Sequence, residues 1–135
     1  MLSYETISPH TLELLKGLMA EPMFASLRLV GGTALALQYG HRSSIDLDFF
    51  GEITEDAEDI KDVLRKYGKL LVIKESKNIK IYQLDGVKID FVNYSYPWID
   101  DAVIDDGITL ASPRDIAAMK INAIEGKKKK KDFID

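Results

Sequence analysis

Three aspartates in two short apolar segments are the residues whose types and spacing could do chemistry. Asp46 and Asp48 are two positions apart in the alternating segment 45–50. On a β-strand their carboxylates point to the same side, about 6.5 Å apart. Asp90 lies in a second β-branched and aromatic segment, 87–93. Carboxylates this close repel one another unless a cation lies between them. An all-oxygen site of this kind suits Mg²⁺.

Asp90, the third carboxylate, makes the interpretation as a metal site more specific than the D-x-D pair alone. If segments 45–50 and 87–93 are neighbours in a sheet, three carboxylates converge on one side. They could then hold two ions about 3.5–4 Å apart that assist an in-line phosphoryl displacement. Two alternatives stay open. The D-x-D pair could lie on the outward face of a solvated edge strand, and Asp90 could pair with Lys88 or mark a sheet edge.

A diglycine precedes the acidic segment. Gly31, Gly32 and Thr33 lie between an expected strand, 27–30, and an expected helix, 34–39. Such a turn exposes backbone N–H groups and the positive end of a helix, and both suit a phosphate, while the threonine adds a hydroxyl donor. It is neither a dinucleotide fingerprint nor a Walker loop. The alternative is a tight structural turn.

One lysine lies on the apolar face of the last expected helix, which begins at Ser112-Pro113. Lys120 is in the middle of that face, whose other members are Ile116, Met119, Ala123 and Ile124. A lysine there either extends its amine to solvent or meets a negative partner. The carboxylate cluster and a bound triphosphate are the candidate partners.

These motifs together resemble a known family. Segments 31–35 (GGTAL) and 42–49 (RSSIDLDF) are similar to the signature of the AbiEii/AbiGii toxin-type nucleotidyltransferases, within the polymerase-β-like superfamily. That signature couples a GG or GS turn to R-x-S-x-D-h-D-h. The similarity continues at 88–90, 115–120 and 131–135, so it touches most of the chain. The first block is the most specific.

The resemblance implies a metal-dependent enzyme that transfers a nucleoside monophosphate from an NTP to an acceptor hydroxyl. Its cofactor would be Mg²⁺, with Mn²⁺ as the alternative ion. Some relatives are toxins of toxin–antitoxin or phage-defence systems, and some modify tRNA. The expected partners are therefore an NTP, an RNA acceptor such as tRNA, and an antitoxin protein. The alternative is a non-catalytic nucleotide-binding module that retains the fold.

The same resemblance assigns roles to residues. The three aspartates would bind metal, and Asp90 would also help to activate the acceptor hydroxyl. Arg42 and Ser44 would orient the acidic strand or the nucleotide. The implied catalytic set is Asp46, Asp48, Asp90 and Lys120, and the implied nucleotide-binding set is Gly31, Gly32, Thr33, Arg42 and Ser44.

The elements that must position these residues alternate along the chain. A helix begins at Ser8-Pro9, and another is capped by Thr54. Strands are expected over 27–30, 45–50, 70–74, 79–84 and 87–93, with a hairpin turn at Asp85-Gly86. We expect an α+β fold in which helices flank a small mixed sheet. By the same resemblance, residues 1–135 are expected to form a single nucleotidyltransferase-like domain that lacks the further C-terminal helices of the family.

Composition narrows the class of protein. Of the 135 residues, 46% are hydrophobic and 30% charged, so a packed core is expected. The absence of cysteine excludes disulfides, thiol catalysis and cysteine zinc sites. A net charge of −4 argues against nucleic-acid binding by the whole surface. No apolar run reaches the length of a membrane span, and no signal peptide is evident, so a cytoplasmic location without membrane contact is expected.

Two further segments carry alternatives. Tyr94, Tyr96 and Trp98 surround Pro97 and could stack on a nucleobase or form a packed loop. The run Lys127–Lys131 could contact RNA phosphates, or form a solvated tail.

Overall fold

The computed structural model describes residues 2–40 and 46–119. Residues 113–119 form the described part of a last helix. The other elements, in chain order, are η1 (Tyr4–Thr6), α1 (Pro9–Ala20), η2 (Pro22–Phe24), β1 (Arg28–Val30), α2 (Gly31–Tyr39), β2 (Leu47–Gly51), α3 (Ala57–Arg65), β3 (Leu70–Glu75), β4 (Ile79–Leu84), β5 (Val87–Asn93), β6 (Val103–Asp105) and β7 (Ile108–Leu110).

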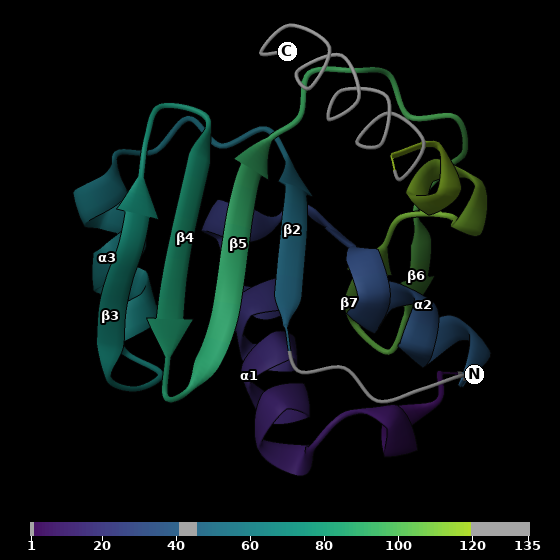
Figure 1. Ribbon diagram of the computed structural model, residues 1–135, viewed down its shortest axis with the longest axis horizontal. Helices are drawn as coiled ribbons and strands as arrows, with labels where there is room; N and C mark the ends of the chain where they lie inside the picture. Colours follow the sequence, from purple (N-terminus) through teal and green to yellow (C-terminus); the bar gives the residue numbers. More distant parts are fainter. Residues whose placement is uncertain (1, 41–45, 120–135) are drawn as a thin grey trace, which may run out of the picture.

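One mixed sheet organises the molecule. Its strand order is β3-β4-β5-β2-β1-β7-β6, and only the pairs β2–β5 and β1–β7 are parallel. Helices α1 and α3 lie behind the sheet in Figure 1 and cover one of its faces, while α2 packs against β1, β2 and η1. The expected α+β class, with helices around a small mixed sheet, is confirmed.

Alternation along the central strands separates core from site. In β2, Leu47 and Phe49 are buried, whereas Asp48 is only half-buried. In β5, Ile89 and Phe91 are buried in the same way. Because successive side chains of a strand point to opposite faces, the residues between these apolar ones lie on the other face of the sheet. We call this second face the open face.

Local signals in the sequence explain most element ends. The hydroxyl of Ser8 accepts a hydrogen bond from the backbone N–H of Thr11 at 3.2 Å, which caps α1. Asp85 and Gly86 have φ of 48° and 84°, as a primed hairpin turn requires. The expected cap by Thr54 is wrong: α3 begins at Ala57, and Asp56 occupies the N-cap position.

A second hairpin was not predicted. Strands β6 and β7 extend the sheet beyond β1, where β7 pairs in parallel with β1. Their turn is Asp106-Gly107, with φ of 53° and 79°. The Asp106 carboxylate accepts hydrogen bonds from the Tyr4 hydroxyl at 2.6 Å and from the Lys16 amine at 2.9 Å. This hairpin therefore also anchors the N-terminal segment.

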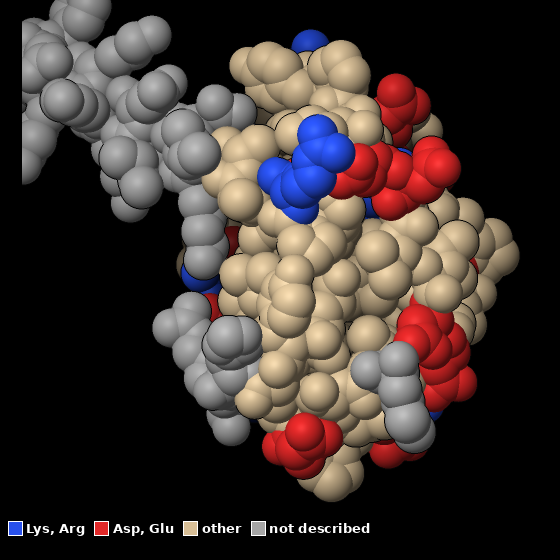
Figure 2. Space-filling view, turned by 90° about the vertical axis from the view of Figure 1, so that its right-hand side faces the viewer, with Lys and Arg blue, Asp and Glu red and all other residues tan. Residues whose placement is uncertain are grey.

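The surface on the β6 side is mostly uncharged. Figure 2 shows acidic side chains scattered over this side and basic ones confined to small spots, with no broad basic patch among the residues that it colours by charge. No helix within 2–40 or 46–119 is long and apolar enough to cross a membrane.

Candidate active site

Two aspartates meet on the open face. The parallel pairing of β2 with β5 places Asp48 directly opposite Asp90. Neighbouring strands lie about 4.8 Å apart, so two carboxylates in register on one face are close neighbours. The condition set out from the sequence, that the two acidic segments are neighbours in the sheet, is met over Leu47–Gly51 and Ile89–Asn93.

The electrostatics of this pair are unfavourable as it stands. Burial, and then the negative charge of Asp90, raise the pKa of Asp48 to about 6, while the nearby Lys88 acts in the opposite direction. Lys88 Nζ lies 3.7 Å from Asp90 Oδ2, so the expected alternative of a Lys88–Asp90 pair is also present. The other oxygen, Asp90 Oδ1, is buried and has no hydrogen-bond partner. A buried carboxylate oxygen without a partner is costly and is a good ligand for a cation.

Asp46 stands at the edge of this arrangement. It directly precedes β2, and its charge contributes to the raised pKa of Asp48. Its backbone carbonyl accepts a hydrogen bond from the hydroxyl of the buried Thr33. Within the described ranges, no group of three or more His, Cys, Asp or Glu side chains is arranged to hold a metal ion. The structure thus brings two of the three predicted carboxylates together as a pair.

Gly31 is the residue that permits the Asp48 carboxylate to lie against α2. The helix begins at Gly31 itself, whereas the sequence predicted a turn there and a helix only from residue 34. A Cβ at Gly31 would lie 2.5 Å from Asp48 Oδ2, and its φ of +74° is one that side chains rarely adopt. The Asp48 carboxylate therefore approaches the first turn of α2, where backbone N–H groups lack helical partners and the helix dipole is positive.

A cavity of about 240 Å³ adjoins the carboxylates. It lies between the open face and the helix at 113–119, whose Ile116 and Met119 form one wall. Its remaining lining residues are Val30, Gly31, Asp48, Phe50, Asp90 and Val92. The site is therefore a recess with an acidic floor and apolar sides.

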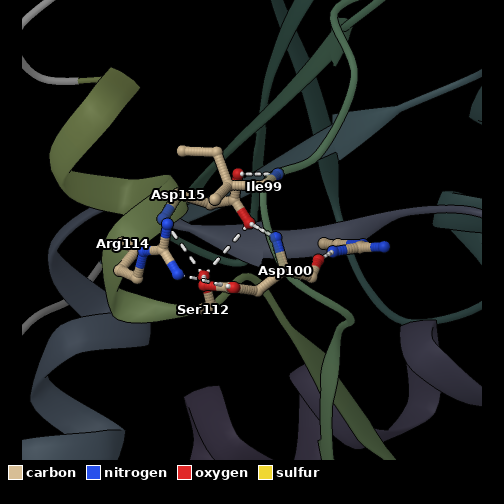
Figure 3. Close-up of polar contacts among 6 residues, drawn as sticks. Ile99, Asp100, Ser112, Arg114 and Asp115 are labelled. Atoms are coloured by element: carbon tan, nitrogen blue, oxygen red, sulfur yellow. Dashed lines mark hydrogen bonds and ion pairs between the residues drawn. The ribbon is translucent and has the colours of Figure 1, made fainter.

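Asp115 holds that wall in place (Figure 3). Its backbone N–H donates to the Ser112 hydroxyl at 3.1 Å, as the predicted helix start requires. Its buried carboxylate also accepts from the backbone N–H groups of Ile99 at 2.8 Å and Asp100 at 3.1 Å. Burial acts to raise the pKa of Asp115, but these hydrogen bonds outweigh it and lower the pKa below its usual value. The helix start expected at Ser112-Pro113 is consistent with the first contact, and nothing in the sequence predicted the loop partners.

Three predicted site residues, Arg42, Ser44 and Lys120, lie outside the described residues, as does the run at 127–131. Their predicted roles stay predictions.

A comparison with known protein families identifies the family to which this chain belongs. The model of the family described as "Nucleotidyl transferase AbiEii toxin, Type IV TA system" matches residues 13–135. This chain belongs to the AbiEii family. The resemblance inferred from GGTAL and RSSIDLDF is therefore confirmed, and the AbiEii match includes both the Gly31 turn and the Asp48–Asp90 pair.

The chain is also similar to one curated protein in sequence and to solved structures in fold. An uncharacterized Aquifex aeolicus protein, aq_aa25, is 40% identical over 111 residues, covering 79% of this chain and 54% of that protein. The chain thus spans about half the length of this curated relative. A Thermotoga maritima protein, TM1012, provisionally assigned as a nucleotidyltransferase, has 18% identity and a TM-score of 0.57, covering 95% of this chain and 94% of that one. The Thermotoga maritima CCA-adding enzyme in complex with tRNA has 19% identity and a TM-score of 0.52, covering 82% and 28% respectively.

Proposed function

We propose that this AbiEii-family chain transfers a nucleoside monophosphate from an NTP to an acceptor hydroxyl. The observation that carries the proposal is the in-register pair Asp48 and Asp90, facing Gly31 at the start of α2. That arrangement combines acidic ligands with an N-terminal helix turn suited to phosphate. The AbiEii family match supports nucleotidyl transfer as the reaction class.

The residues present fit a divalent cation, with Mg²⁺ as the proposed cofactor and Mn²⁺ as the alternative. Asp90 offers a buried oxygen without a partner, and burial, followed by the negative charge of Asp90, raises the pKa of Asp48. We assign Asp48 and Asp90 as the principal ligands and Asp46 as a third carboxylate beside them. When bound, such an ion neutralises phosphate charge and acidifies a nearby hydroxyl.

Other residues of the chain would bind and orient the nucleotide. The backbone N–H groups of Gly31, Gly32 and Thr33, in the first turn of α2, are the proposed triphosphate contacts. The Thr33 hydroxyl positions the start of β2 through the Asp46 carbonyl. Asp90 would also accept the proton of the acceptor hydroxyl. Arg42, Ser44 and Lys120 keep the roles that the family resemblance gives them.

The proposed acceptor is RNA, with tRNA as the leading case. The likeness in fold to a CCA-adding enzyme that was solved with tRNA supports this class of acceptor. The family description as a type IV toxin supports a role in a toxin–antitoxin pair, with an antitoxin protein as a partner.

One observation favours a second candidate function. Within residues 2–40 and 46–119, three metal-ligating side chains do not come together. A module that binds a nucleotide without transferring it needs fewer ligands than a two-ion enzyme. The alternative is therefore a non-catalytic nucleotide-binding protein with the nucleotidyltransferase fold.

The test uses the full chain with each α-labelled NTP, total tRNA and Mg²⁺. The proposal expects label to appear in RNA, and to be lost with Asp48→Asn and with Asp90→Asn. The control is Asp62→Asn, because the Asp62 side chain is 72% exposed and pairs with the neighbouring Arg65 on α3. Nucleotide binding without transfer would establish the alternative. Transfer at the wild-type rate by Asp48→Asn would contradict the proposed site.

A further inference from the structure

A group of aromatic side chains extends from the carboxylate pair along the open face. Phe50 follows Asp48 by two residues on β2, so both share that face, and its register partner on β5 is Val92. Tyr94 follows Val92 by two residues, and its backbone N–H still donates to the Gly51 carbonyl at 3.0 Å. The row of Phe50 therefore lies about 6.5 Å beyond the row of the carboxylates.

The rings form one connected group, which we call the aromatic strip: Phe50, Tyr94, Tyr96 and Trp98. The ring of Tyr94 is central, with centroids 5.6 Å from Phe50, 5.5 Å from Tyr96 and 4.8 Å from Trp98. All three separations lie within the range of favourable aromatic pairs. The strip thus runs without interruption from the 240 Å³ recess, which Phe50 lines, to the surface.

The strip has a fixed inner part and an open outer end. The Arg28 guanidinium lies over Trp98 at 4.4 Å and donates to the Asp100 carbonyl at 2.9 Å, which holds Trp98 in place. Tyr96, in contrast, is 69% exposed. The sequence left open whether these aromatics pack or stack on a base, and the structure shows packing for the inner rings and an accessible ring at the end.

We propose that the aromatic strip stacks a nucleobase, either the base of the bound NTP or the terminal base of an RNA acceptor. This inference rests on the proposed function, since it places a nucleotide at the neighbouring carboxylates. A flat π-face binds every base with little sequence preference.

The chain contains its own reporter for this contact. Trp98 is its only tryptophan, and it lies within the strip. A base that stacks there should quench Trp98 fluorescence. Titrations of the full chain without divalent ions, corrected with free tryptophan, would use three probes: an NTP, a short single-stranded RNA, and ribose 5-triphosphate, which lacks a base.

Tyr96→Ala should weaken binding of the base-containing probe about tenfold, the size of one lost stacking contact, while Tyr96→Phe retains it. Tyr39→Ala is the matched control, because Tyr39 is a 54% exposed tyrosine at the far end of α2. Preferential loss of NTP binding assigns the strip to the nucleotide, and preferential loss of RNA binding assigns it to the acceptor. Equal affinity of the wild type for ribose 5-triphosphate and NTP would exclude the NTP base as the stacked base. Wild-type binding of both the NTP and the RNA by Tyr96→Ala would overturn the inference.

The design also separates this inference from the proposed function. Asp48→Asn should abolish transfer yet leave the quenching of Trp98 intact. Quenching without any transfer by the wild type would reject the enzyme and keep the stacking site. Transfer by the wild type, together with unchanged binding by Tyr96→Ala, would keep the enzyme and reject the stacking site.

Discussion

At the scale of single residues, the Asp48–Asp90 pair is an unfavourable contact built into the centre of the sheet. The β2–β5 register places Asp48 and Asp90 side by side, so strand pairing keeps the bases of their two side chains close together. The raised pKa of Asp48 and the unpartnered Asp90 Oδ1 are two signs of the same crowding. In the absence of metal, protonation of Asp48 should therefore increase the unfolding free energy of the chain.

The first prediction concerns pH. The pKa of Asp48 rises on folding to about 6, so the folded chain binds the proton more tightly than the unfolded chain. Stability from this group is complete below the unfolded pKa and falls as pH rises through 6, by roughly 2–3 kcal/mol. Asp48→Asn should consequently unfold at a higher temperature than wild type at pH 7 in chelator, with the difference shrinking at pH 4.

Mg²⁺ supplies the control for that experiment. It should raise the unfolding temperature of the wild type at pH 7 and leave Asp48→Asn unchanged, since binding to the folded state alone stabilises it. A variant no more stable than wild type at pH 7 would show that the carboxylates do not repel one another.

The second prediction concerns Gly31. Gly31 and Gly107 have nearly equal φ, +74° and +79°, but only Gly31 has a neighbour where a Cβ would go. Gly107→Ala should cost about 1 kcal/mol of unfolding free energy from backbone strain alone. Gly31→Ala should cost more, because its methyl group displaces the Asp48 carboxylate.

Urea denaturation of the double variant isolates this contact. In an Asp48→Ala background, the cost of Gly31→Ala should fall towards that of Gly107→Ala. Equal costs in both backgrounds would mean that Asp48 does not crowd Gly31.

The sequence predicted the meeting of the two aspartates better than it predicted the close approach of Asp48 to Gly31. Asp48 and Asp90 lie in segments with clear alternation, which determines the face each side chain takes, so their meeting needed only strand adjacency. The close approach at Gly31 depends on a backbone angle and on a side chain from another strand. Neither is visible in the pattern GGT.

At the scale of elements, the helix at 113–119 depends on a buried charge. Asp115 links the helix start to the loop that follows β5, and this helix forms a wall of the recess. A substitution that changes the carboxylate oxygens of Asp115 should therefore destabilise the helix at 113–119.

The third prediction is that Asp115→Asn lowers the unfolding free energy at pH 7 by about 2 kcal/mol, because an amide N–H then faces a backbone N–H. The pKa of Asp115 is lowered on folding, so its contribution is present above the unfolded pKa and lost as pH falls through the folded value. Urea denaturation at pH 7 and pH 3 should show the gap between wild type and variant narrowing in acid. Asp62→Asn should behave like wild type at both.

Element prediction succeeded where signals were long and failed where strands were short. Strands β4 and β5 match the predicted 79–84 and 87–93, because each alternates over six or seven residues around an Asp-Gly turn. The hairpin β6–β7 has the same Asp-Gly turn, but each strand is three residues long and offers almost no alternation. Its place in the sheet comes from pairing with β1, a tertiary contact.

At the scale of the whole molecule, a single sheet crosses from β3 to β6, so no seam divides the described residues (Figure 1). The fourth prediction is therefore a single cooperative unfolding transition. Trp98, packed on Arg28 of β1, reports on one part of the sheet, while far-UV circular dichroism reports on all elements. Their urea midpoints should coincide, as two-state unfolding requires. Separate midpoints would show two folding units and contradict the predicted single domain.

The parallel contact between β2 and β5 has a consequence for how the protein is made. Everything from α3 to β4 is inserted between the two strands, so the nascent chain must close a long loop before Asp90 meets Asp48. Such non-local pairings form slowly. A ribosome-bound chain that ends before Val87 lacks β5, and therefore lacks Asp90 as the neighbour of Asp48. Whatever this recess binds, it becomes available only once that loop is closed.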